Sequence, residues 1–222
     1  MGRSPGAVVC AALGANIALA AAHLMAQLRL YTDLGRMAHG EPVLRAQMWV
    51  GNLSGVQTAA FVGTGLLFVG WFVQAWEHAD VERLRPGRRW WRSRTWALAG
   101  WFVPAANLGI PLLLSLDMWS SARPRATARY RSPLWVVVWW VTFVSWTYVA
   151  GSAKSRYERA ESADAIREAL HAGIVADVLG ALAGLAAIMF VWQLSRSLTS
   201  RESASSQAQG ARTVPAPPAL PS

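Results

Sequence analysis

Residues 95–119 read TWALAGWFVPAANLGIPLLLSLDMW, an apolar stretch that is interrupted by Pro104, Asn107, Gly109 and Pro111. A helix of about 20 apolar residues crosses a bilayer, and this stretch is long enough. Each proline, however, removes a backbone donor and clashes with the carbonyl four residues earlier, which excludes one straight helix. Backbone groups freed inside lipid must be satisfied by protein or by water in a cavity. The stretch therefore predicts a membrane protein that contains a broken segment.

The breaks in this segment share one face if the segment is helical. They follow an i, i+4, i+7, i+11 pattern, which a helix places on one stripe: Gly100, Pro104, Asn107 and Pro111. Two arrangements fit the pattern: a kinked helix that spans the membrane, or a re-entrant or interfacial hairpin. Asp117 and Trp119 indicate that the far end of the segment lies at the membrane surface.

The composition of the whole chain supports the membrane class. Of the 222 residues, 54% are hydrophobic and only 15% are charged, whereas soluble domains carry about 25% charged residues. The chain has 13 tryptophans, a residue that favours the membrane–water boundary. Its single cysteine, Cys10, excludes an intrachain disulfide and a cysteine metal cluster.

Charged loops separate five apolar segments: 7–28, 55–76, 95–119, 133–151 and 171–194. We therefore predict an all-α integral membrane domain over residues 1–194, with four to five transmembrane helices, one of them broken by Pro104 and Pro111. Residues 29–54 are predicted to form a connecting loop. Residues 195–222 are rich in Ser, Ala and Pro and are predicted to be a disordered tail.

The first apolar segment carries its polar residues on one helix face. Asn16, His23 and Gln27 share that face with Ala20, because the four positions follow an i, i+4, i+7, i+11 pattern. Such a face forms a hydrogen-bonding seam between helices or, alternatively, a site for a ligand or a proton. We favour the seam, because polar residues in membrane helices more often form hydrogen bonds between helices than ligand sites.

The last apolar segment combines an acid with small residues on one face: Gly173, Asp177, Gly180 and Gly184. The spacing of Gly180 and Gly184 is a motif for close helix packing. Asp177 is the only carboxylate well inside an apolar segment, and an acid at that depth is a candidate functional site. We predict that His23 is its partner, with Gln27 nearby. The alternative is a neutral, hydrogen-bonded Asp177 that only fixes the register of the helices.

Basic residues concentrate in the short loops, and the chain has a formal net charge of +9. The most basic loop carries six arginines that we expect to bind anionic lipid headgroups: Arg83, Arg85, Arg88, Arg89, Arg92 and Arg94. Trp90 and Trp91 interleave with them, a pattern that also binds single-stranded nucleic acid. Beside two apolar segments the lipid interpretation is the simpler one, and we expect no nucleic-acid partner.

The same charges bear on the topology. If residues 95–119 do not cross, the termini and the two Arg-rich loops carry 14 basic residues, against 7 on the other side. The positive-inside rule then places both termini in the cytoplasm. If all five segments cross, the division is 11 against 10, and the rule is silent. In the four-crossing arrangement, His23 and Asp177 lie at similar depth near the outer side and can meet.

The sequence WFVPAANL at 101–108, followed by Pro111 and by DMW at 117–119, resembles the signature of the domain-of-unknown-function family numbered 4328. The resemblance covers about residues 55–194. It implies a bacterial integral membrane protein with several spans and no established activity. Arginine is almost the only basic residue, which is typical of a GC-rich bacterial genome, and we expect the protein in the cytoplasmic membrane of a bacterium.

Three classes of function remain open. The first is a non-enzymatic scaffold, assembly or sensor subunit that packs through small-residue helix faces against copies of itself or other membrane proteins. The second is a small oligomeric transporter or channel component in which Asp177 and His23 relay protons or hold a cation. An enzyme is the least favoured, because the sequence contains no metal-ligand motif, nucleophile elbow or P-loop. We accordingly expect no cofactor, no bound metal and no catalytic residue.

Overall fold

The computed structural model describes residues 5–35, 41–79, 93–122 and 133–213, and contains only helices and connections there. The helices of these ranges are α1 (Pro5–Gly35), α2 (Glu41–His78), α4 (Arg94–Ala99), α5 (Pro104–Asn107), α6 (Ile110–Ser121), α7 (Leu134–Glu158) and α8 (Ala163–Thr213). The described part of the chain has no strand, which confirms the prediction of an all-α fold.

Four of these helices, α1, α2, α7 and α8, are long and apolar enough to cross a membrane. The protein is therefore a multi-pass membrane protein. Residues 95–119 do not add a fifth helix of this kind, because they are divided among α4, α5 and α6. The longest of the three, α6, has 12 residues and is about 18 Å long, against about 30 Å for the hydrocarbon core.

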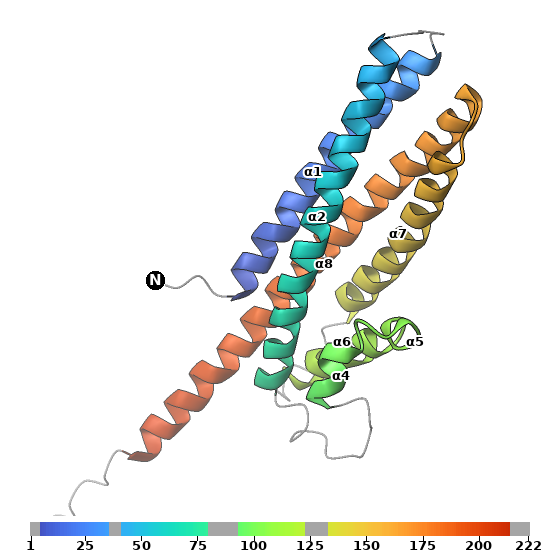
Figure 1. Cartoon of the computed structure of the whole chain (residues 1–222). Helices are drawn as coiled ribbons and strands as arrows, with labels where there is room; N and C mark the ends of the chain where they lie inside the picture. The colour runs from blue at the N-terminus through green and yellow to red at the C-terminus, as the bar shows by residue number, and fades with distance from the viewer. Residues whose placement is uncertain (1–4, 36–40, 80–92, 123–132, 214–222) are drawn as a thin grey trace, which may run out of the picture.

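The long helices form two antiparallel pairs, α1 with α2 and α7 with α8, and α8 packs against both α1 and α7 (Figure 1). Helices α2 and α7 hardly contact each other through their backbones. The beginning of α1, the end of α2 and the beginning of α7 lie toward one end of the bundle (Figure 1). Helices α4, α5 and α6 lie at that same end, which we call the inner end; the opposite end is the outer end.

The broken segment does not form the single helix face that the sequence predicts for its four helix-breaking and polar residues. Pro104 begins α5, and Pro111 lies in the first turn of α6, so both prolines start helices instead of bending one. The first turn of a helix has backbone donors without intrahelical partners, and a proline there removes no hydrogen bond. Because residues 100–103 and 108–109 are not helical, Gly100, Pro104, Asn107 and Pro111 do not share a helix face.

Two contacts hold the turns of this segment in place. The ring nitrogen Nε1 of Trp140 donates to the carbonyl oxygen of Leu108 at 3.3 Å, which satisfies a backbone acceptor at the second break. A Cβ atom on Gly100 would lie 2.7 Å from the carbonyl oxygen of Trp96 and 2.9 Å from Cγ2 of Ile110. Glycine therefore lets the end of α4 and the beginning of α6 approach closely at this point.

Aromatic side chains form the core at the inner end. Phe72 and Phe190 are fully buried, and the ring of Phe190 stacks on Trp139 at 5.1 Å between centroids. Trp101 of the broken segment meets the edge of Phe72 at 5.2 Å. Trp119, which the sequence predicts at the membrane surface, is only 6% exposed and belongs to this core. Aromatic packing thus attaches the broken segment to the long helices.

The three glycines predicted to pack helices all lie against other helices. A Cβ atom on Gly173 would collide with the side-chain amide of Gln27, and one on Gly184 would lie 2.9 Å from Cγ1 of Ile17, both on α1. A Cβ atom on Gly180 would lie 2.8 Å from Nε1 of Trp146 on α7. Small residues on α8 therefore permit close packing on two sides, although Gly180 faces a different helix from the other two.

Two predicted non-helical regions are largely helical. Residues 29–54 were expected as a loop, but α1 extends to Gly35 and α2 begins at Glu41, since Leu30, Val50 and Leu170 form a second core beyond the apolar segments. Helix α8 also continues through residues 195–213 and extends past its neighbours (Figure 1). Leu198 packs on the main core, and extending an existing helix requires no new nucleus. Residues 214–222 of the predicted tail lie outside the described residues.

Candidate functional site

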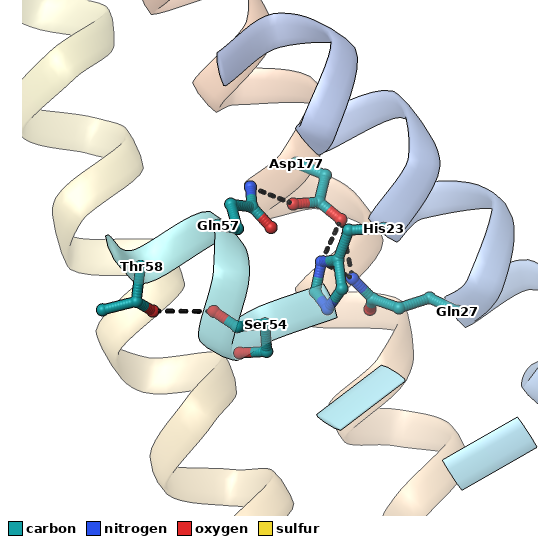
Figure 2. Close-up of polar contacts among 6 residues, drawn as sticks. All are labelled: His23, Gln27, Ser54, Gln57, Thr58 and Asp177. Carbon is teal, nitrogen blue, oxygen red and sulfur yellow. Dashed lines mark hydrogen bonds and ion pairs between the residues drawn. The ribbon is translucent and has the colours of Figure 1, made fainter. Parts of the chain in front are cut away.

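Asp177 is the centre of a buried hydrogen-bond cluster that joins three helices (Figure 2). Its Oδ2 atom lies 2.8 Å from Nδ1 of His23 and accepts a hydrogen bond from Nε2 of Gln27 at 2.7 Å. Its Oδ1 atom accepts from Nε2 of Gln57 at 3.3 Å. Asp177 is 6% exposed and Gln27 is 3% exposed. Groups on α1 and α2 therefore satisfy one carboxylate of α8 inside the apolar part of the bundle.

The predicted pairing of His23 with Asp177, with Gln27 nearby, is confirmed by these contacts. His23 and Gln27 are four residues apart on α1, so both side chains point toward α8. Sequence reasoning does not single out Gln57. The available signal is that Gln57 is a polar residue in an apolar segment, about three residues from the end at which His23 and Asp177 also lie.

The contacts limit how the hydrogens of the cluster can be arranged. Nδ1 of His23 and Nε2 of Gln27 converge on the same oxygen of Asp177 and lie 3.0 Å from each other. Two donors can share one carboxylate oxygen, so a hydrogen on Nδ1 together with an ionised Asp177 is one arrangement that satisfies both contacts to Oδ2. The second ring nitrogen, Nε2, is buried and has no hydrogen-bond partner among the described residues. One polar atom of the cluster is therefore left open.

Asn16, the third polar residue of the α1 face, contacts a different helix. Its side-chain nitrogen donates to Oγ1 of Thr64 and, at 3.4 Å, to the carbonyl oxygen of Ala60, both on α2. Thr64 is 8% exposed. The predicted seam on α1 thus serves two neighbours: Asn16 joins α1 to α2, and His23 and Gln27 join α1 to α8.

A cavity of about 360 Å³, the outer cavity, adjoins the Asp177 cluster. His23, Gln27, Gln57 and Asp177 line it, together with Ser54 and Thr58 of α2 and the aromatic rings of Phe61, Trp146 and Tyr157. Lys154 and Glu158 near the end of α7 also line it, and these two form an exposed ion pair at 3.9 Å. The outer cavity therefore extends from the buried carboxylate toward the outer end of α7.

A second cavity of about 360 Å³, the inner cavity, lies between the long helices on the side of the broken segment. Phe61 and Trp146, whose ring centroids are 4.8 Å apart, line both cavities and bridge α2 to α7 between them. The inner cavity has mostly apolar walls, and its polar lining residues are Asn16, Gln57, Thr64 and Asn107. We call the two cavities together the cleft.

Part of the broken segment lines the inner cavity. Trp101, Phe102 and Asn107 contribute to its wall, whereas Gly100, Pro104 and Pro111 shape the turns. Nε1 of Trp101 and Oδ1 of Asn107 are buried without a hydrogen-bond partner among the described residues. Asp117 is half-buried on α6 and lines neither cavity, so the structure does not bring it to the site.

The predicted headgroup arginines are represented in the structure by Arg94 alone; Arg83, Arg85, Arg88, Arg89 and Arg92 lie outside the described residues. Nε of Arg94 lies 2.7 Å from Oε1 of Glu77, and both side chains are exposed. An exposed pair of this kind contributes about 0–1 kcal/mol to stability. No cluster of three His, Cys, Asp or Glu residues that could hold a metal ion occurs in the described ranges.

Comparison with known proteins identifies a family but no activity. The model of the family described as "Domain of unknown function (DUF4328)" matches residues 35–196. No curated protein and no solved structure matches the chain. The matched region includes α2, the broken segment, α7 and the part of α8 that carries Asp177, but it excludes most of α1, which supplies His23 and Gln27.

The cluster predicts an order of stability for two substitutions of Asp177. Asp177→Leu leaves three side-chain donors without their acceptor, of which Gln27 is buried and His23 and Gln57 are half-buried; a buried donor left unsatisfied costs about 1–3 kcal/mol, so this variant should unfold at the lowest temperature. Asp177→Asn retains one acceptor oxygen and should be intermediate. Thermal unfolding of the purified protein in detergent measures the order, with Asp164→Leu, an exposed acid on the same helix, as the control. Parent-like stability of Asp177→Leu contradicts the assigned role of the carboxylate.

Proposed function

We propose that this chain, which belongs to the DUF4328 family, is a non-enzymatic membrane subunit that accommodates an apolar lipid chain in the cleft between α2 and α7. The role is that of a sensor or assembly subunit. In this role the separation of α2 from α7 depends on whether the inner cavity is occupied. The observation that carries this proposal is the inner cavity, because the pairs α1–α2, α1–α8 and α7–α8 are closely packed whereas α2 and α7 are not.

The lining of the inner cavity supports a lipid chain as its occupant. Val62, Leu66 and Phe102 line it and are also 55%, 62% and 64% exposed, so its mouth opens where the long helices face the bilayer. A volume of about 360 Å³ lies in the range of small-molecule sites, about 300–1,000 Å³. An apolar cavity that opens to lipid is reached most directly by an acyl or isoprenoid chain.

The polar groups of the inner cavity support binding over catalysis. Asn16 and Thr64, in the middle of its wall, are hydrogen-bonded to each other and hold α1 against α2. Nucleophilic or acid–base catalysis requires a reactive group with a base or acid within hydrogen-bond reach. The walls of the inner cavity, where a nucleophile, acid or base would have to act on a bound molecule, consist mainly of hydrocarbon and aromatic side chains.

A second candidate function is a transport or channel component, favoured by the Asp177 cluster. Its carboxylate is buried in a transmembrane helix, beside a cavity and in contact with a histidine. Acid–histidine pairs at such a depth serve as proton or cation sites in transporters. Four long helices are few for a lone transporter, so this function requires an oligomer.

The proposed setting is the cytoplasmic membrane of a bacterium, with the inner end on the cytoplasmic side. Both termini and the two Arg-rich connections belong to this end in a four-crossing arrangement, and their arginines would bind anionic headgroups. The proposed protein partners are copies of this chain or other membrane proteins. Gly55, Ala59 and Gly63 form an exposed small-residue ridge on α2 that such a partner could cover.

Filling the inner cavity should prevent lipid from being retained. Gly65 lines this cavity, and a Cβ atom on it would meet nothing within 4 Å, so Gly65→Leu should place its side chain in the space of the cavity. Gly70→Leu is the matched control, because Gly70 also has free space but lines neither cavity. Native mass spectrometry of protein purified in mild detergent should detect several-fold less bound phospholipid for Gly65→Leu alone. Equal retention by both variants contradicts the proposal.

The proposed orientation predicts a cytoplasmic C-terminus. A C-terminal fusion to a reporter that is active only in the cytoplasm should be active, and a fusion to a periplasm-dependent phosphatase should be inactive. The same reporters inserted between α1 and α2 provide the control, and their activities should be reversed. An active phosphatase at the C-terminus contradicts the four-crossing orientation.

A further inference from the structure

The outer cavity contains a negative charge that the described residues do not neutralise when His23 is uncharged. Asp177 accepts hydrogen bonds from Gln27 and Gln57, which are neutral, and its only titratable partner in the described ranges is His23. With a neutral imidazole that donates from Nδ1, the cluster keeps one net negative charge. A buried charge without a counter-ion is costly, and a cation in the adjoining cavity would offset that cost.

The second ring nitrogen of His23 requires a hydrogen-bond donor as its partner. When Nδ1 carries the hydrogen, Nε2 is an acceptor, and it has no partner among the described residues. The hydrogen bond from Nδ1 to Asp177 strengthens Nε2 as an acceptor, as a carboxylate does for a metal-bound histidine. His23 lines the outer cavity and its side chain retains 13% exposure. Because His23 lines the outer cavity, a donor bound there would supply the missing partner of the buried Nε2 atom.

The remaining walls suit the carbon part of an organic cation. Trp146 and Phe61 form one boundary of the outer cavity, and Tyr157 lies farther along it. Aromatic faces attract ammonium groups and the polarised methylene groups next to them, by about 0.5–2 kcal/mol. A hydrated inorganic ion gains little from such walls, whereas an alkylammonium ion uses both the aromatic faces and the acceptor.

We propose that the outer cavity binds a small organic ammonium ion, whose N–H group donates to Nε2 of His23 and whose charge is balanced by Asp177. The aromatic rings at the boundary between the two cavities contact its carbon chain. The site shares the cleft with the proposed lipid-binding function, but it does not require a lipid in the inner cavity.

Three probes of similar size test the proposal on the parent protein in phosphatidylcholine nanodiscs. The n-butylammonium ion has both the charge and N–H donors, butyltrimethylammonium has the charge alone, and n-butanol has a donor without charge. Titration calorimetry should give saturable binding of n-butylammonium, with both other probes at least tenfold weaker. No saturable n-butylammonium binding overturns the proposal, and so does equal binding of either other probe.

A pair of histidine variants tests the assigned acceptor. His23→Asn keeps a side-chain N–H for Asp177 but removes the Nε2 atom, and n-butylammonium should bind at least tenfold more weakly. His171→Asn is the control, because His171 is exposed near the outer end and does not line the cavity. Unchanged affinity in a folded His23→Asn protein overturns the assignment. The three-probe comparison uses the parent protein and does not depend on lipid retention by Gly65→Leu. The ammonium-binding proposal and the lipid-binding function can therefore fail independently of each other.

Discussion

The arrangement of the long helices depends on the hydrogen bonds that the carboxylate of Asp177 accepts. The carboxylate accepts hydrogen bonds from α1 through His23 and Gln27 and from α2 through Gln57. Helix α2 packs mainly on α1 and has little backbone contact with α8, and side chains connect the two helices: Gln57 with Asp177, and Trp71 with Phe190. In lipid the hydrophobic effect does not drive helices together, and a satisfied buried polar group fixes their register and rotation. The side chain of Asp177 thus helps to fix the position and orientation of α1, α2 and α8 relative to one another.

The cleft follows from the residues that surround this cluster. Glycines on α8 let α1 and α7 approach it closely, which brings α8 to the middle of the bundle. Between α2 and α7, large aromatic rings take the place of glycines, and the pair Phe61 and Trp146 keeps the two backbones apart. The broken segment contributes to the wall of the inner cavity because its prolines start short helices where a fifth long helix would otherwise form. A polar cavity and an apolar cavity consequently lie next to each other in one cleft.

The parts of the structure that depend on residue type and depth can be predicted from the sequence. An acid and a histidine at the same depth of two apolar helices have few other partners, and His23 does contact Asp177. The role of Gln57 cannot be predicted in this way, because a glutamine near the end of a span can equally point to solvent. The stripe from Gly100 to Pro111 presupposes one continuous helix, and the structure instead starts a new helix at each proline. The helical course of residues 195–213 depends on continuity with α8 and on contacts such as that of Leu198, which composition does not contain.

The central claim is that His23 and Asp177 are hydrogen-bonded within the membrane. Magic-angle-spinning NMR of the protein in lipid bilayers, with 15N-labelled histidine and 13C-labelled aspartate, measures this contact directly. A distance of 2.8 Å between Nδ1 and Oδ2 predicts a correlation between an imidazole nitrogen and an aspartate side-chain carboxyl carbon. That correlation should disappear in Asp177→Asn. Its absence from the parent protein, or its persistence in the variant, would contradict the account.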